Sequence, residues 1–126
     1  MFRIINKLKN RRGFTLIELI VVLAVLAIIL AIAVPRFLGV QEDAKEDADI
    51  SSLGLIAKTA ELYYVQGKID DDSTDTEIIT AIEDDFPNGV EFKSKKAGAP
   101  AYLDDVKFTI EDGVIITEVG TLKSTD

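Results

Sequence analysis

The chain has 126 residues, of which 48% are hydrophobic and 29% are charged, and its formal net charge is −8. It contains no histidine and no cysteine, so it lacks the usual general base, the thiol nucleophile, any disulfide and most transition-metal ligand sets. The net negative charge argues against a nucleic-acid-binding protein, because such proteins contact the phosphate backbone with basic residues. We therefore expect neither catalysis nor a bound cofactor, metal or nucleic acid, and the length leaves room for one modest domain.

The dominant feature of the sequence is one apolar run. Every side chain from Leu19 to Val34 is apolar, and the stretch from Phe14 to Val34 is interrupted only by Thr15 and Glu18. As a helix this stretch would be about 32 Å long, which is enough to cross the hydrocarbon core of a bilayer. Five basic residues and no acidic residue precede Gly13, a bias that holds the N-terminus on the cytoplasmic side. The sequence thus predicts a single membrane crossing with the rest of the chain outside.

Glu18 needs a partner, because an unpaired carboxylate near the edge of a bilayer costs on the order of a few kcal/mol. If the chain were cut between Gly13 and Phe14, the new α-amine of Phe14 would lie about one helical turn from Glu18, in the same chain or in a neighbour. Alternatively, the Glu18 side chain reaches back to the lipid headgroups.

The segment GFTLIE at residues 13–18, behind a short basic leader and ahead of the apolar run and Pro35, resembles the class III signal and N-terminal helix of type IV pilins and pseudopilins. The resemblance covers about Lys7 to Gly67 and is strongest to a major type IV pilin of a monoderm bacterium. It implies cleavage after Gly13 by a prepilin peptidase and N-methylation of Phe14.

The resemblance also implies how the chain assembles. Copies of the subunit would form a helical filament with the apolar helices at its centre, and Glu18 would pair with the Phe14 amine of a neighbouring subunit. Pro35 would be the proline near which the helix bends or melts on assembly. The implied partners are the lipid bilayer before assembly, the prepilin peptidase, and an inner-membrane assembly platform with its assembly ATPase. The precursor would lie in the cytoplasmic membrane and the assembled filament outside the cell.

Three alternatives to a major pilin stay open at this point. Within the family, the chain could be a pseudopilin of type II secretion or of competence DNA uptake. Outside it, Ala31-Ile32-Ala33 after a basic start and an apolar core also fits a secretory signal peptide, which would make the remainder a secreted binding domain. A single-span anchored binding domain is the third. The N-terminal residue of the mature protein distinguishes these classes.

We divide the chain into a leader at residues 1–13, the apolar helix at 14–35, an amphipathic half of the same helix at 36–67, and a C-terminal part at 68–126. In the second half of the helix, apolar residues recur at steps of three and four, which predicts one face packed on a core and an acidic face in solvent. The apolar positions include Ala44, Ala48, Leu53, Ile56, Ala57 and Ala60. We expect an interruption near Pro35 and a C-cap at Gly67.

The segment after Gly67 is predicted to hold a polar loop and a short helix. Asp70, Asp72 and Thr74 have the spacing of a calcium loop, but Asp75 and Ala81 stand where a glycine and a bidentate glutamate belong. We therefore favour a loop that caps a helix, with Thr74 and Glu77 as a capping box. One face of that helix should be apolar, formed by Ile78, Ile79, Ile82 and Phe86.

Alternating residues then predict three antiparallel strands, at 90–93, 106–110 and 114–119, the last two joined by an Asp112-Gly113 turn. Packed on the long helix, they would complete an α+β fold with a long N-terminal helix on a small antiparallel sheet. We expect the basic loop at 94–100 to be flexible and residues 121–126 to fray.

Outside the leader, three lysines gather in one short segment, Lys93, Lys95 and Lys96. Their default interpretation is a solvated strand end. As a second hypothesis, they contact the acidic face of the next subunit in a filament. That face is formed by the stretch from Glu42 to Asp49, with Glu42, Asp43 and Glu46 as the candidate partners.

Overall fold

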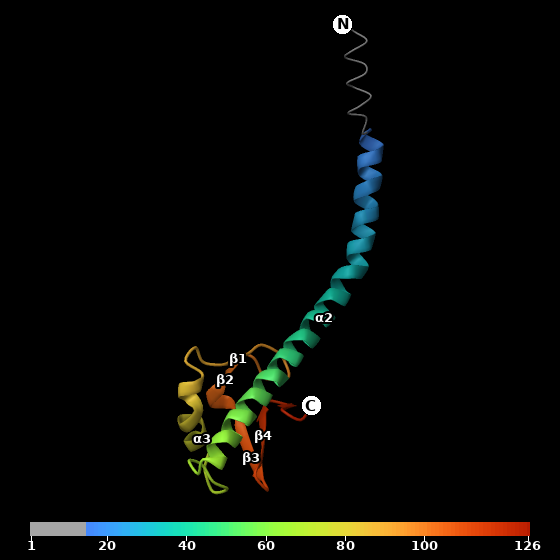
Figure 1. Cartoon of the computed structure of the whole chain (residues 1–126). Coiled ribbons are helices and arrows are strands. Elements are labelled where there is room, and N and C mark those ends of the chain that lie inside the picture. The colour runs from blue at the N-terminus through green and yellow to red at the C-terminus, as the bar shows by residue number, and fades with distance from the viewer. Residues whose placement is uncertain (1–14) are drawn as a thin grey trace. The chain divides into compact units, whose positions relative to one another are not determined.

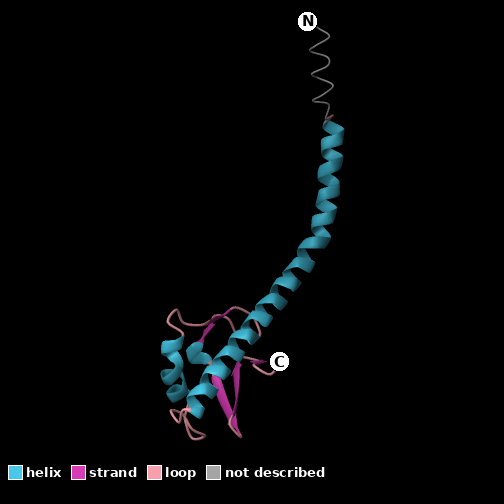
Figure 2. Ribbon diagram, viewed as in Figure 1, coloured by secondary structure: helices cyan, strands magenta, loops and turns pink. Residues whose placement is uncertain are grey.

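The computed structural model describes residues 15–126, so the leader with Gly13, and Phe14, lie outside the described residues. The chain forms two compact units that meet between Gly39 and Val40. It combines helices with antiparallel strands, which confirms the α+β prediction (Figure 1, Figure 2). The elements are α2 (Leu16–Val65), α3 (Asp75–Ile82), the 3-10 helix η1 (Glu83–Asp85), β1 (Glu91–Phe92), β2 (Ala101–Tyr102), the 3-10 helix η2 (Leu103–Asp105), β3 (Lys107–Glu111), β4 (Val114–Val119) and β5 (Leu122–Lys123).

Helix α2 is 50 residues long and continues through Pro35, so the expected interruption at that residue is absent. Proline removes one backbone donor, but Ala31, Ala33 and Leu38 nearby are good helix formers and the helix propagates on both sides. At the other end, Gly67 has φ +76. The Gly67 amide donates to the Tyr64 carbonyl and the Lys68 amide to the Tyr63 carbonyl, which is a Schellman motif and confirms the predicted C-cap.

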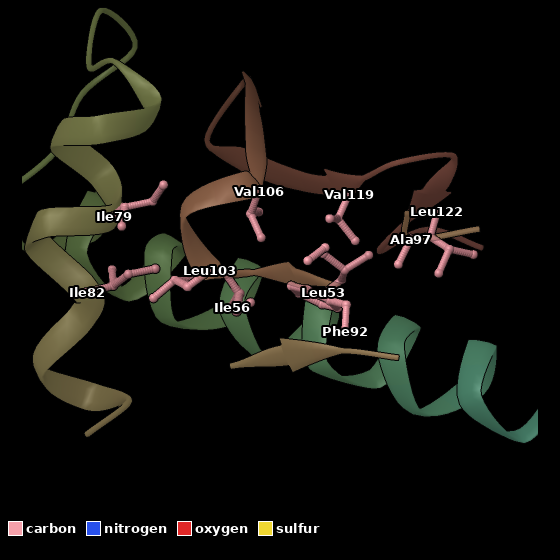
Figure 3. Close-up of a cluster of buried hydrophobic side chains, with 11 residues drawn as sticks. Leu53, Ile56, Ile79, Ile82, Phe92, Ala97, Leu103, Val106, Val119 and Leu122 are labelled. Carbon is pink, nitrogen blue, oxygen red and sulfur yellow. The ribbon is translucent and has the colours of Figure 1, made fainter. Parts of the chain in front are cut away.

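The second half of α2 is amphipathic, as predicted. Leu53, Ile56 and Ala60 are fully buried. Leu53 and Ile56 pack with side chains from the strands and from α3 (Figure 3), and Ala60 packs in a second cluster with Ile78 and Ile115. The buried face begins at Asp49, and both Ala44 and Ala48 are exposed although we placed them on it. The apolar side of the helix therefore contributes to the core only over its last four to five turns.

The strands form two sheets rather than the single sheet predicted. β1 pairs with β2, and β4 lies between β3 and β5 in the larger sheet. The expected strand at 90–93 therefore does not join β3 and β4, and their third partner is β5, which lies in the segment that we expected to fray. Leu122 anchors β5 because its side chain is only 3% exposed. The predicted turn is confirmed, with positive φ at Asp112 and Gly113.

The short helix α3 has the predicted capping box. The Glu77 amide donates to Thr74 Oγ1, and the Thr74 amide donates to Glu77 Oε2. Ile78, Ile79 and Ile82 are buried, as expected from their spacing. In the loop before the helix, Asp70 Oδ1 accepts from the Asp72 amide and from the Ser73 hydroxyl, so this carboxylate stabilises the turn.

Candidate assembly site

The N-terminal end of α2 holds Glu18 in a second capping box. The Thr15 amide donates to Glu18 Oε2, and the Glu18 amide donates to Thr15 Oγ1, both at 3.2 Å. The carboxylate thus has a partner in its own chain that sequence reasoning missed, although the T-x-x-E spacing ahead of an apolar run was the signal for it. Gly13 and Phe14 lie outside the described residues, so cleavage, methylation and the pairing of Glu18 with the Phe14 amine stay predictions.

Among residues 15–39, the apolar part of α2 packs against no other element. Every described residue from Thr15 to Gln41 is exposed, and the large apolar side chains range from 48% at Leu26 to 74% at Leu16. Among residues 15–126, one helix is long and apolar enough to cross a membrane, and it is α2. An apolar surface of this length on a water-exposed rod marks a contact with lipid or protein.

In the unit from Val40 to Asp126, which we call the domain, Asp49 binds the start of the basic loop at 94–100 to α2. Its carboxylate accepts from the Ser94 amide at 2.8 Å and from the Lys93 amide at 3.1 Å. Asp49 is 3% exposed and Ser94 is fully buried. The loop at 94–100 is therefore anchored at its start, against the expectation that it is flexible. Sequence reasoning missed Asp49 as a buried residue, because its neighbours in the sequence belong to an acidic, solvated face.

The lysines and acids that we singled out come together within one chain. The Lys95 amide donates to Glu42 Oε1 at 2.6 Å, and Lys96 Nζ lies 3.3 Å from Glu46 Oε2. Asp43 makes neither of these contacts and is exposed. The contact of Lys93, Lys95 and Lys96 with a neighbouring subunit stays a prediction. In that contact, the Glu42 and Glu46 carboxylates would already be bonded to the Lys95 amide and the Lys96 side chain of their own chain.

Two tyrosines at the end of α2 are tied to acids in the connecting segment. The Tyr63 hydroxyl donates to Asp85 Oδ2 at 2.7 Å and the Tyr64 hydroxyl to Asp71 Oδ1 at 3.1 Å. The hydrogen bond to Asp85, followed by partial desolvation and by the charges of Asp85 and Asp84, raises the pKa of Tyr63. The bond to Asp71 and its charge are the main causes that raise the pKa of Tyr64.

Comparison with known proteins agrees with the exposed apolar helix. Residues 8–34 match the family model described as the prokaryotic N-terminal methylation motif. Prepilin peptidase-dependent protein A of Clostridium perfringens is 31% identical over 101 residues, which is 80% of this chain and 72% of that protein. The chain belongs to the type IV pilin family.

Two further relatives each match a little less than half of this pilin's length. The type IV wide pilus major component PilA4 of Thermus thermophilus is 34% identical over 58 residues, and a fimbrial protein of Pseudomonas aeruginosa is 33% identical over 61 residues. These matches span 44% and 40% of the two relatives, less than half of each. No solved structure gives a significant match.

Proposed function

We propose that this pilin is the structural subunit of a type IV pilus, made as a prepilin that is anchored in the cytoplasmic membrane. The single observation that carries the proposal is an exposed apolar helix that bears the methylation motif. The leader at residues 1–13 stays in the cytoplasm, and the domain from Val40 onward lies outside. A prepilin peptidase cuts after Gly13, and Phe14 becomes the methylated N-terminus.

Assembly transfers the apolar helix from lipid to the helices of neighbouring subunits. Both environments are apolar, so the transfer keeps the same surface away from water, worth about 25 cal/mol per Å² of buried area. Removing the leader takes away five basic residues and changes the net charge from −8 to −13, before the new amine is counted. An inner-membrane platform and its ATPase supply the work of extraction. The Thermus relative named as a major pilus component supports this role over that of a secretion or competence pseudopilin.

Glu18 sets the register of the subunits in the filament. In the free chain its carboxylate is satisfied by the Thr15 amide, so the capping box lowers the cost of holding an acid at the edge of the membrane. In the filament the carboxylate accepts from the α-amine of Phe14 on a neighbouring chain. A misplaced subunit would leave this carboxylate buried without the amine, which destabilises its contact with the filament by several kcal/mol. Misplaced subunits are therefore excluded.

Two measurements test this function. Mass spectrometry of the mature protein should show a chain that begins at methylated Phe14; a start at Met1 or near Val34 would rule out the prepilin pathway. The Glu18→Ala variant should be inserted and cut normally but yield no sheared filaments. Asp72→Ala, at an exposed acid outside every proposed contact, is the matched control and should keep them. Normal filaments from Glu18→Ala would overturn the role of the charge pair while leaving the processing result in place.

A further inference from the structure

We propose that the domain of this pilin carries a lysine-binding groove, which holds lysine side chains from the β5 edge of a second copy of the chain. The inference rests on the proposed function, because the second copy is the next subunit of the filament. The groove lies between residues 83–91 and 102–104 and has a volume of about 560 Å³. We define the β5 edge by Lys95 and Lys123, which are both exposed.

The groove has the chemistry that an ammonium group needs. Its apolar lining comes from Phe86, Val90 and Leu103, and Tyr102 at the groove is 51% exposed. Four carboxylates complete the lining, those of Glu83, Asp84, Glu91 and Asp104. An aromatic face next to carboxylates binds a lysine both by cation–π attraction and by charge-assisted hydrogen bonds, while its methylene stem covers apolar surface.

No ion pair within residues 15–126 balances the negative charge of the groove. Among residues 15–126 there are two ion pairs, Lys58 with Glu61 and Lys96 with Glu46, and neither includes a groove carboxylate. The helical acids Glu42 and Glu46 already contact their own basic loop. The groove is thus an acidic surface that a cation from another copy can neutralise without breaking an ion pair of the described residues.

The β5 edge is a well-ordered donor of that cation. The Thr121 amide donates to the Lys96 carbonyl at 2.8 Å, so the loop that carries Lys95 and the turn before Lys123 are held together. Gly120 makes this close approach possible, because a Cβ at that position would overlap the Lys96 carbonyl. The backbone that carries the two lysines is therefore fixed before contact, and only their side chains lose conformational freedom when they enter a groove.

Helix α3, which precedes the groove residues, and the C-terminus, which follows β5, are on opposite sides of α2 in Figure 1. Among residues 15–126, neither Lys95 nor Lys123 forms an ion pair with a groove carboxylate, so these lysines do not fill the groove of their own copy. A contact between two different, complementary surfaces is head-to-tail, and repeated head-to-tail contacts build an open helical assembly rather than a closed dimer.

Charge exchange in the full-length chain tests the contact. Glu83→Lys with Asp104→Lys, or Lys95→Glu with Lys123→Glu, should each lower the yield of sheared filaments about tenfold, because like charges then face each other. All four substitutions in one chain should restore the yield. Asp72→Lys with Lys107→Glu is the matched control outside both surfaces and should leave it unchanged. Equal thermal unfolding of the purified variants in detergent micelles would show that all of their domains fold. A fourfold variant that folds but stays poor in filaments would overturn the proposal.

Cross-linking provides a second, direct test, since the natural chain has no cysteine. In filaments of Asp104→Cys with Lys123→Cys, a short bismaleimide should link subunits into a ladder of covalent oligomers. Either single variant should give no ladder, and neither should Asp72→Cys with Lys123→Cys. Normal filaments without a ladder would overturn the groove contact and leave the pilus function standing. If the unmodified chain forms no filaments, the proposed function itself is wrong.

Discussion

Leu26 and Leu53 belong to the same helix, but Leu26 is 48% exposed and Leu53 is fully buried. The unit that ends at Gly39 exposes all of its described residues, whereas the unit that begins at Val40 encloses its own core. The difference shows which surroundings each unit needs in order to bury its apolar side chains. The domain completes itself within the chain, and the apolar helix depends on lipid or on other copies of the pilin.

The largest expected effect comes from a charge in the apolar helix. Leu26→Lys places an ammonium near the middle of the run, which costs about 3 kcal/mol for insertion at the centre of a membrane helix. We expect little membrane-held pilin and no filaments, as measured by immunoblots of the membrane and sheared fractions.

Leu55→Lys is the matched control for this variant. Leu55 lies on the same helix and is 59% exposed, but it belongs to the domain. A lysine there should change the free energy of unfolding by no more than about 0.5 kcal/mol. Normal insertion and normal filaments from Leu26→Lys would contradict the conclusion that the middle of the run lies in an apolar environment.

A smaller effect is expected at Asp49. Asp49→Ala removes the acceptor of the Lys93 and Ser94 amides and leaves both donors inside the domain without it, so we expect the free energy of unfolding to fall by about 1.5–3 kcal/mol. Thermal unfolding of the full chain in detergent micelles measures the change. Asp49→Asn keeps one acceptor oxygen and should lose less. Asp47→Ala, an exposed acid one half-turn away, should be neutral; equal losses at 47 and 49 would argue against the buried carboxylate as the cause.

Most of the fold was predictable wherever a pattern repeats over several residues. The apolar run, the Thr74 capping box, the Gly67 cap and the Asp112-Gly113 turn each follow from local chemistry, and the structure confirms the last three. The α+β architecture follows from the change of period after Gly89.

What could not be predicted depends on pairing over long distances. β1, β2 and β5 have two residues each, which is too short for an alternating pattern, so the sequence does not say which strand joins which. Asp49 has the same difficulty, since its partners lie 44 and 45 residues away and the local pattern assigns it to solvent. For the assembly site, the sequence predicts cleavage at Gly13, methylation of Phe14 and pairing of Glu18 with the Phe14 amine, and these three roles stay predictions.

The smallest expected effect is the pH dependence of stability that comes from Tyr63, near the C-terminal end of α2. The bond to Asp85 favours the neutral phenol, so it raises the pKa of Tyr63 above its ordinary value of 10.0 in the folded chain. Its contribution to stability is therefore complete below that ordinary value and is lost as the pH rises through the higher folded pKa. Asp85→Asn should lower the pKa of Tyr63, measured by the ultraviolet absorbance of the phenolate with Tyr63→Phe to assign the signal. Asp71→Asn should act on Tyr64 instead. Unchanged titration in both variants would contradict the hydrogen bonds that join these two tyrosines to the connecting segment.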